Sequence, residues 1–561
     1  MTVLPEFIPP SPGAWELEQI HLTRPVSVFM ADVFPSPMIR GFADGTKAYG
    51  VLLDYLDVAV INRFVYMAPR PVGAPKSAKG APPRLVFEIL RRIHPQIRRR
   101  IKRAEIVIRD RHWRHEVQWW HNEVKPSMAA TAHALLKDDV STLSISALVD
   151  HIHRATAFMA ETTYWHHRFD ICAMLPVGDF VSHVMDWTGL PVGEILHVVR
   201  GLSPVSAGAV DELAALRRAI QADPEAMALA LSDRPAADVL SALQANTGAA
   251  GPAARAYLDV VGLRILGAYD PAEPHAREHP ELLLKIIRTA VTSDEVIRTA
   301  TADQAIARLR DRVPADHRAE FDVLLEDTRL TYGVRDERIF HGDALGAGVV
   351  RRAILAAGDR LKAQGKAHDP SHLVDATSEE IIALLEGRAG PSADDLAERS
   401  RFRLHTPLSS APARLGFPPS PPPPAEWLPP AAARIQRSVN LVLSLMFDTH
   451  KRSESNILKG FGVSPGVYEG PARVIRNVDE LHLVQQGEVL VAAATSSTFN
   501  VVLPLIGALV TERGGALSHA AIVAREYGLP GVVGCPGAVA AIKTGMRVRV
   551  DGATGEVWTA V

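Results

Sequence analysis

The stretch that decides the fold runs from Thr511 to Gly534 and reads TERGGALSHAAIVAREYGLPGVVG. It predicts a strand, a double-glycine turn, a helix over Ser518–Tyr527 and a second strand, in that order. Gly528 stands where a helix C-cap is expected, and Pro530 two residues later prevents the helix from continuing. The alternation of strand and helix predicts an α/β layer in this part of the chain.

His519 occupies the first turn of this predicted helix, directly after Ser518, a residue type suited to N-capping. A helix N-terminus offers free N–H groups and a positive dipole end, which favour a phosphoryl anion. Gly514 and Gly515 let a ligand or another segment approach the backbone closely. A lone histidine at a helix start is usually a cap or a surface residue, but this context indicates a phosphorylated histidine. Gly514, Gly515 and Ser518 are then the phosphoryl-binding residues.

Short strand-like runs broken by glycine surround this helix, whereas the preceding four hundred residues are mostly helical in pattern. The fold class predicted is multidomain, with a mainly α-helical N-terminal region and a C-terminal β/β/α domain. The predicted strands are Ala472–Ile475, Glu488–Ala493, Ala508–Thr511, Gly531–Val533 and Arg547–Val550. The clearest predicted helices are Val210–Ala222, Glu281–Val291, Val350–Gln364 with Gly365 as its C-cap, and Ala431–His450.

A proline-rich segment separates the two regions. Ten of the 25 residues of 406–430 are proline, which excludes a helix or a central strand and favours an extended chain. It is either a disordered spacer or a semi-rigid arm between two moving parts. We therefore predict a helical region of one or two lobes over 1–405, a linker over 406–430, a linker helix over 431–459 and the C-terminal domain over 460–561.

Composition excludes several classes of protein. The 61 Lys and Arg residues balance 63 Asp and Glu, which argues against a dedicated nucleic-acid binder or a polybasic membrane protein. Arg91–Arg114 holds ten basic residues near three tryptophans, and a solvated helix face is the favoured interpretation there. Two cysteines provide no disulfide framework, and no signal peptide or membrane span is evident, so a cytoplasmic location without nucleic-acid or membrane partners is expected.

The C-terminal hundred residues resemble the mobile phosphohistidine domain of the phosphoenolpyruvate-utilising enzymes and of rifampin phosphotransferase. The similarity runs from about Phe461 to Val561 and includes GVSPGVYEGPARVI, GEVLVA and GMRVRVDGATGEVW besides the histidine motif. It implies a swivelling domain in which His519 carries a phosphoryl group between distant sites. Leu517 stands where dikinases usually have threonine, and an apolar residue there is similar to rifampin phosphotransferase.

Members of this family also carry an ATP-grasp domain, and the synthases add a phosphoenolpyruvate-binding barrel. A (β/α)8 barrel needs about 250 residues, and no glycine-rich phosphate cradle is recognisable in the first 430 residues. We expect a separate ATP-grasp protein, like the N-terminal part of phosphoenolpyruvate synthase, to supply ATP and Mg2+. No cofactor is then expected to bind this chain stably.

The upstream region resembles, more patchily, the acceptor-binding domain of rifampin phosphotransferase and the matching subunit of phenylphosphate synthase. The blocks that carry this likeness are Ile20–Ser27, Gly262–Leu284 and Tyr332–Gly365. The likeness implies a catalytic role for Arg335 in YGVRDERI. Ile339 replaces the lysine expected four residues later, so Arg338 is the candidate for the second basic role. A guanidinium can hold the oxygens of a transferring phosphoryl group at two points.

The acceptor hydroxyl must lose a proton, and a histidine is the usual base. His21, His166, His167 and His183 are candidates for the acceptor site, together with Arg264, and the sequence does not choose between them. No metal site is expected, because no metal-binding motif accompanies the histidines and neighbouring histidines point to different faces of a helix.

The leading hypothesis is a phosphohistidine-dependent, dikinase-type phosphotransferase component that delivers the phosphoryl group of His519 to an organic hydroxyl acceptor. A phenol, an alcohol and an antibiotic-like compound all suit that role. Two alternatives remain open. One is a non-catalytic ligand-binding or regulatory subunit that retains the fold, and the other is a stand-alone antibiotic phosphotransferase.

Overall fold

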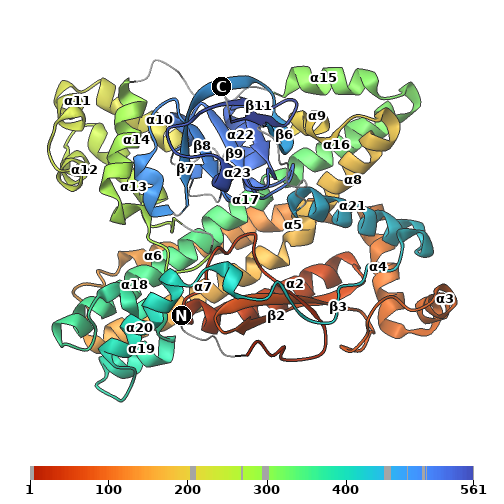
Figure 1. Cartoon of the computed structure of the whole chain (residues 1–561), viewed down its shortest axis with the longest axis horizontal. Coiled ribbons are helices and arrows are strands. Elements are labelled where there is room, and N and C mark those ends of the chain that lie inside the picture. The colour runs from red at the N-terminus through yellow and green to blue at the C-terminus, as the bar shows by residue number, and fades with distance from the viewer. Residues whose placement is uncertain are drawn as a thin grey trace. The chain divides into compact units, whose positions relative to one another are not determined.

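The structure is a computed structural model of the 561-residue chain. It describes residues 6–202, 210–266, 269–292, 302–447, 457–476, 478–495, 499–500 and 502–559. The chain divides into two compact units. The first unit comprises residues 1–179, 269–273 and 337–440, and the second comprises 180–268, 274–336 and 441–561. Figure 1 labels the elements of both.

The first unit is a helical assembly around one small sheet. Its strands are β1 (Ala14–Leu17), β2 (Leu53–Ile61), β3 (Phe64–Pro71) and β4 (Arg414–Gly416). Its helices are α1 (Val28–Val33), α2 (Pro35–Tyr49), α3 (Arg84–Ile93), α4 (Pro95–Asp110), α5 (His112–Trp119), α6 (Lys125–Lys137), α7 (Ile145–Arg168), α18 (Ala344–Ala363), α19 (Ser378–Leu385) and α20 (Ala393–His405). Two π-helical turns, η1 (Trp120–Val124) and η5 (Ile339–Asp343), interrupt this helical region.

The sheet of the first unit has the strand order β2-β3-β1-β4, a feature that the sequence patterns did not predict. A two-residue loop joins β2 to β3, and both of its residues, Asn62 and Arg63, have positive φ. Two such residues form the type of turn that matches the twist of a hairpin. β4 lies in the proline-rich segment and pairs only at the edge of the sheet, where proline is tolerated on its flanks.

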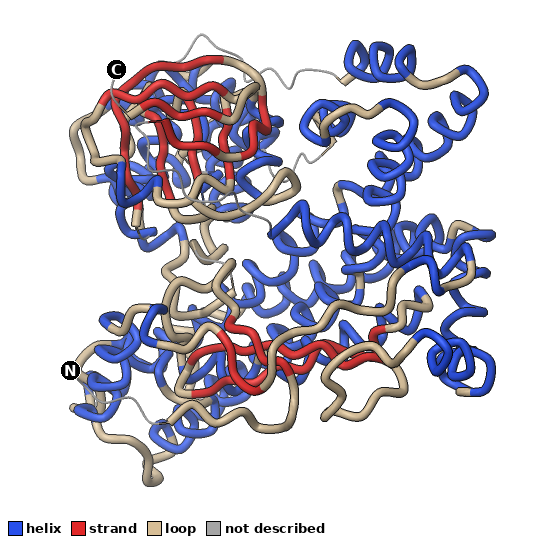
Figure 2. Tube along the Cα trace, turned by 45° about the vertical axis from the view of Figure 1, so that its right-hand side comes forward, coloured by secondary structure: helices blue, strands red, loops and turns tan. Residues whose placement is uncertain are grey.

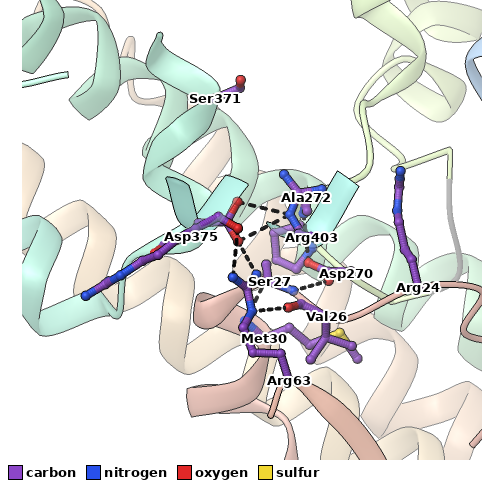
Figure 3. A network of polar contacts seen from close by, with 12 residues as sticks. Arg24, Val26, Ser27, Met30, Arg63, Asp270, Ala272, Ser371, Asp375 and Arg403 are labelled. Atoms are coloured by element: carbon purple, nitrogen blue, oxygen red, sulfur yellow. Dashed lines mark hydrogen bonds and ion pairs between the residues drawn. The ribbon is translucent and has the colours of Figure 1, made fainter. Parts of the chain in front are cut away.

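A buried ionic network holds the segments of the first unit together (Figure 3). Asp375, at the end of the 3-10 turn η6 (Pro370–Asp375), is fully buried and accepts hydrogen bonds from Arg63 and Arg403. Arg63 also donates to the carbonyl oxygen of Val26, at 2.8 Å. Beside it, Asp270 accepts from the backbone N–H of Ser27, at 2.7 Å. Shared polar contacts therefore hold together segments that are distant in the chain, namely residues 26–30, 63, 270, 375 and 403.

The second unit combines a helical part with the C-terminal sheet domain. Its helices are α9 (Val192–Ile195), α10 (Val210–Gln221), α11 (Pro224–Leu231), α12 (Ala236–Ala245), α13 (Ala250–Val261), α14 (Pro280–Thr292), α15 (Asp303–Arg312), α16 (Arg318–Tyr332), α22 (His519–Tyr527) and α23 (Ala538–Ala541). Three more helices, α8 (Asp170–Thr188), α17 (Val334–Arg338) and α21 (Pro430–Phe447), contribute residues to both units.

The C-terminal domain is built on eight strands in the order β5-β12-β11-β7-β8-β9-β10-β6, drawn in red in Figure 2. These are β5 (Ile457–Lys459), β6 (Phe461–Ser464), β7 (Val467–Ile475), β8 (Val489–Ala492), β9 (Ala508–Thr511), β10 (Gly531–Val533), β11 (Arg547–Asp551) and β12 (Glu556–Trp558). β7, β8, β9 and β10 are parallel neighbours. Every residue of β8 and β9 is buried, as expected for strands covered on both faces.

The predicted fold class is confirmed, with a mainly helical N-terminal region and a C-terminal sheet domain. The predicted strands correspond to β7–β11, and the helix predicted over Ser518–Tyr527 is α22 with Ser518 as its N-cap. The helix predicted over Ala431–His450 is α21, and His450 lies outside the described residues. Among the described residues, no helix is both long and apolar enough to cross a bilayer.

We predict that Asp375→Asn destabilises the first unit by about 3–5 kcal/mol, because it leaves the buried guanidinium groups of Arg63 and Arg403 without their anion. Urea unfolding followed by tryptophan fluorescence measures this, since six of the eight tryptophans lie in the first unit. The control is Asp394→Asn, whose carboxylate is 93% exposed and pairs with His368. It should change the free energy of unfolding by less than about 1 kcal/mol; equal effects would contradict the prediction.

Candidate functional site

His519 is the first residue of α22, which follows the carboxyl end of the parallel strand β9. β8 ends at Ala492 and is followed by Thr495, and β9 ends at Thr511 and leads through the glycine turn to α22. The carboxyl ends of parallel strands meet at one edge of a sheet, where open α/β sheets commonly bind their ligands. The hydroxyl of Thr495 thereby reaches His519, with 3.0 Å between its Oγ1 and Nδ1.

The other ring nitrogen of His519, Nε2, is buried and makes no hydrogen bond within the part of the chain that the structure describes. A nitrogen that accepts a phosphoryl group must present a lone pair. If Nε2 carries that lone pair, Nδ1 carries the proton and donates it to Thr495. The Thr495 hydroxyl can accept that proton, so the contact is compatible with the tautomer in which Nε2 is the nucleophile.

Burial lowers the pKa of His519 to about 4. The carboxylate of Asp336 opposes this shift, and the guanidinium of Arg335 reinforces it. The imidazole is consequently neutral at physiological pH, the state in which a ring nitrogen can attack phosphorus.

The double glycine holds the loop before His519 against the end of α21. Gly514 has φ of 101°, which favours glycine. A Cβ on Gly515 would lie 2.2 Å from the carbonyl oxygen of Leu445. The N–H groups of Gly515 and Leu517 donate to Met446 and Leu445, at 3.0 and 2.9 Å. In this arrangement the N–H of Gly515 is therefore engaged by α21.

Ser518 caps α22, and its hydroxyl accepts from the N–H of Ala521. Together with the glycine turn, this cap fixes His519 at the first position of the helix, where the dipole favours an anion. The three predicted phosphoryl-binding residues thus all shape the loop around His519.

Arg335, predicted to be catalytic, lies beside this loop. It belongs to α17, and its Nη1 donates to the carbonyl oxygen of Leu517, two residues before His519. Arg338, the second predicted catalytic residue, takes part in a different cluster. Its guanidinium donates to Asp170 and to the carbonyl oxygen of His166, and both residues belong to the first unit with it.

Three of the predicted acceptor-site histidines gather around Tyr269 in the first unit. The ring centroids of His21 and His166 lie 5.6 and 5.8 Å from that of Tyr269. The rings of His166 and His167 are 4.6 Å apart, so the expectation that they point to different faces was wrong. His167 closes the last turn of α7, just before α8 begins at Asp170.

His21 forms a pair with Glu18. The two side chains meet at 3.2 Å, and the Glu18 carboxylate also accepts from the N–H groups of Ile20, His21 and Leu22. Burial acts to raise the pKa of Glu18, but His21 and these N–H groups outweigh burial and lower it. Glu18 is therefore an anion that fixes the orientation of the half-exposed imidazole of His21.

Two buried carboxylates complete the polar cluster of the first unit. Asp170 contacts His167 at 3.0 Å and receives a hydrogen bond from Arg338. Burial acts to raise its pKa, but Arg338 and the two histidines lower it. Asp343, at the end of η5, contacts Nδ1 of His166. Burial raises the pKa of Asp343 to about 8, against the opposing charges of His167 and Arg338.

His183 and Arg264 belong to the second unit. The ring of His183 packs 5.5 Å from that of Trp187. Burial lowers the pKa of Arg264 to about 9, with Glu212 opposing the shift. The structure thus brings together His21, His166 and His167, but places His183 and Arg264 elsewhere in the fold.

Sequence reasoning missed Thr495, Tyr269 and Asp343. A signal for Thr495 was present, since the hydroxyl-rich stretch 495–498 comes two residues after the strand predicted over Glu488–Ala493. Tyr269 and Asp343 carry no such signal, because each reaches the cluster only through the packing of segments distant in the chain.

Comparison with known families agrees with this geometry. The model described as PEP-utilising enzyme, mobile domain matches residues 484–555, which contain both Thr495 and His519. Residues 484–555 are thus similar to the mobile domain of the PEP-utilising enzymes. A second model, described as rifampicin phosphotransferase fourth domain, matches residues 178–336. Arg335, the residue against the loop of the mobile domain, lies within that second match.

Several curated proteins are similar to part of the chain. A Bacillus subtilis protein named uncharacterized phosphotransferase YvkC is 30% identical over 241 residues, 43% of this chain and 27% of that protein. A rifampicin phosphotransferase of Streptomyces sp is 28% identical over 317 residues, 54% of this chain and 34% of that protein. Phosphoenolpyruvate synthase of Pyrococcus furiosus is 44% identical across 105 residues, 19% of this chain and 13% of that enzyme. The chain spans about a third or less of each of these curated relatives.

We predict that His519 titrates near pH 4 in the folded chain, well below the ordinary histidine value of about 6.5. NMR of chains labelled at the histidine Cε1 measures this, with His519→Asn assigning the signal. Arg335→Gln should raise the pKa, because its guanidinium disfavours the imidazolium. The unfolded chain binds this proton below about pH 6.5 and the folded chain only near pH 4, so stability falls as the pH drops between them. Titration of His519 at its ordinary value would contradict the prediction.

Proposed function

We propose that this chain is the phosphohistidine-carrying component of a phosphotransferase, in which His519 receives a phosphoryl group from ATP and delivers it to an organic hydroxyl acceptor. One observation carries the proposal: a neutral histidine at a helix N-terminus, with Nδ1 held by Thr495 and Nε2 without a hydrogen bond among the described residues. The match to the mobile domain supports it.

In the first step the lone pair of Nε2 attacks phosphorus, and the bond from phosphorus to the leaving oxygen breaks. In the scheme of this family the attacked atom is the β-phosphorus of ATP, and AMP leaves. Water then cleaves the bond to the γ-phosphoryl group, so that inorganic phosphate is released and phosphohistidine remains. In the second step the acceptor oxygen attacks the same phosphorus, and the P–N bond returns its electrons to Nε2. The proton of the acceptor hydroxyl passes to a base.

The chain supplies charge complementarity for these steps. The phosphoryl oxygens carry negative charge, and the N-terminus of α22 and the guanidinium of Arg335 provide the nearest positive potential. We assign Arg335 as the residue that stabilises the phosphoryl group while it is bound to His519. In this proposal Arg338 neutralises Asp170 and does not contact the phosphoryl group.

The acceptor side of the proposal draws on the aromatic and histidine cluster of the first unit. Tyr269 offers a ring against which a phenol or another flat hydroxyl compound can pack. His21, oriented by the Glu18 carboxylate, is the candidate base for the acceptor proton, in the way that a carboxylate orients histidine in hydrolases. His166 and His167 are further acceptor contacts in this proposal.

We further propose that ATP and Mg2+ bind to a separate ATP-grasp chain and that the mobile domain moves between the two partners. In the described residues 457–559 the helices and strands are those of the mobile domain, and in 6–447 they form helical units with one four-stranded sheet. This part of the proposal is tested by adding candidate ATP-grasp proteins to the purified chain.

We predict that β-labelled ATP, with an ATP-grasp protein present, transfers an acid-labile, base-stable label to the chain and that His519→Asn abolishes it. His482→Asn is the matched control, because that exposed histidine belongs to the same domain, and it should retain full labelling. Absence of label with every partner tested would favour a ligand-binding or regulatory role. Labelling by the chain alone would favour a stand-alone phosphotransferase.

We predict that Thr495→Val slows labelling of His519 by about 10- to 100-fold, since it removes the group that holds the reactive tautomer. Thr495→Ser keeps the hydroxyl and should stay within about threefold of the original rate. Rapid-quench measurement of phosphohistidine formation distinguishes the two variants. Equal rates for both would show that Thr495 does not position the imidazole.

A further inference from the structure

Helix α3 of the first unit, labelled in Figure 1, presents an apolar face to solvent. Of the twelve large hydrophobic side chains that are exposed in the described part of the chain, four belong to this ten-residue helix. Their exposed fractions are 79% for Leu85, 44% for Val86, 54% for Ile89 and 65% for Ile93. At about 100° per residue, the four lie within an arc of about 100° around the helix. We call them the α3 stripe, and a concentration of this kind marks a surface that binds a partner.

The opposite side of α3 is held by the first unit itself. Phe87 is buried, and its ring centroid lies 5.9 Å from that of Trp427. Pro83 is the N-cap of α3, and Pro95 begins α4 two residues after α3 ends, so proline defines both boundaries of the helix. The α3 stripe is therefore carried by a helix that is already formed, and the one aromatic residue of that helix packs inside the protein.

The segment around the α3 stripe is strongly basic. Residues 74–103 contain ten Lys and Arg and a single acidic residue, Glu88, so their formal charge is +9, whereas the whole chain carries -2. Arg100 is buried and donates to Asp54, at 2.8 Å. Most of the other basic residues of the segment are exposed, namely Lys76, Lys79, Arg84, Arg92, Arg98, Arg99 and Lys102.

The balanced charge of the whole chain, on which the expectation of no membrane partner rests, therefore does not describe this surface. Interactions between exposed charges are screened beyond about 10 Å at 0.1 M salt, so a partner that approaches α3 experiences the local charge and not the total.

We propose that α3 binds the surface of an anionic lipid membrane, with the α3 stripe among the acyl chains and the exposed Lys and Arg residues at the level of the headgroups. A helix with aliphatic residues on one face and basic residues beside them is the kind of helix that lies in a membrane interface. The negative potential of anionic lipids attracts the basic residues. Arg92 borders the stripe on the helix, and its long side chain can extend from there to a headgroup.

Three other occupants fit this surface less well. A second copy bound through the same face would bring two strongly positive segments together, and such like-charge contacts are unfavourable. A single-stranded nucleic acid stacks its bases on exposed aromatic rings, but Phe87 is buried. A protein interface is usually anchored by aromatic residues, which the α3 stripe lacks.

Membrane binding goes beyond the proposed function. It does not require that His519 be phosphorylated, because α3 belongs to the first unit and His519 to the second.

Sedimentation of the full-length chain with lipid vesicles tests the proposal. One set of vesicles contains equal amounts of phosphatidylglycerol and phosphatidylcholine, and the other contains phosphatidylcholine alone. We expect binding to the anionic vesicles that is at least about tenfold tighter than to the neutral ones, because the basic segment is attracted only to the former. Raising the salt concentration from about 0.1 M to about 1 M should weaken that binding, since the screening length falls from about 10 Å to about 3 Å.

Two variants separate the α3 stripe from the charge around it. Leu85→Gln combined with Ile89→Gln removes apolar surface without changing the charge, and it should weaken binding to anionic vesicles at least about tenfold. The matched control is Leu404→Gln, because Leu404 is 51% exposed on α20 of the same unit, and it should stay within about twofold. All three side chains are exposed, and circular dichroism verifies that each variant is folded.

Equal binding by the two variants, or no binding to anionic vesicles, would overturn the proposal. Two further measurements identify another occupant if vesicles are not bound. A dimer that the Leu85→Gln, Ile89→Gln variant loses would assign the α3 stripe to a second copy of the chain. A complex with a purified acidic ATP-grasp protein that the same variant loses would assign it to a protein partner.

Discussion

The packing of the first unit is constrained by its buried carboxylates. A carboxylate removed from water needs an opposite charge or several hydrogen-bond donors beside it. Asp375 is fully buried and receives Arg63 from the β2–β3 hairpin and Arg403 from α20. Glu116 and Arg168 form a second buried pair, at 2.6 Å. Burying two ions costs desolvation free energy even when they are paired. An arrangement of the segments that separates them costs more, because it leaves a buried charge without a partner. Such pairs therefore contribute mainly to the specificity of the fold. Asp343 is buried beside His166 instead, and burial raises its pKa to about 8, so that it need not carry a charge at neutral pH.

In the mobile domain, burial acts on a single reactive side chain and leaves it uncharged, instead of pairing it with an opposite charge. Its sheet core is apolar, with every residue of β8 and β9 buried, and it is a rigid base for one reactive side chain. Burial keeps the imidazole of His519 neutral, Thr495 holds one ring nitrogen, and the second is left without a hydrogen bond among the described residues. The strain-free N-terminus of α22 then provides an environment in which a phosphoryl anion on that nitrogen is stabilised.

Much of this domain could be predicted from the sequence because its signals are local. Ser518 caps a helix that Gly528 ends in a left-handed conformation, and both residue types have strong positional preferences. The small sheet of the first unit could not be predicted in the same way. β1 and β4 are about 400 residues apart, and their pairing depends on packing rather than on the pattern of either segment.

The sequence by itself therefore determined the identity of the phosphohistidine candidate, its place at a helix N-terminus and the helical character of the region before it. Capping, glycine conformation and hydrophobic periodicity act over a few residues, so they can be read along the chain. Only the tertiary structure decided that Thr495 and Arg335 lie around His519, that Arg338 pairs with Asp170, and that Asp343 meets His166. Those contacts join segments up to 182 residues apart, and the burial and charge that set their chemistry arise only when the chain is packed.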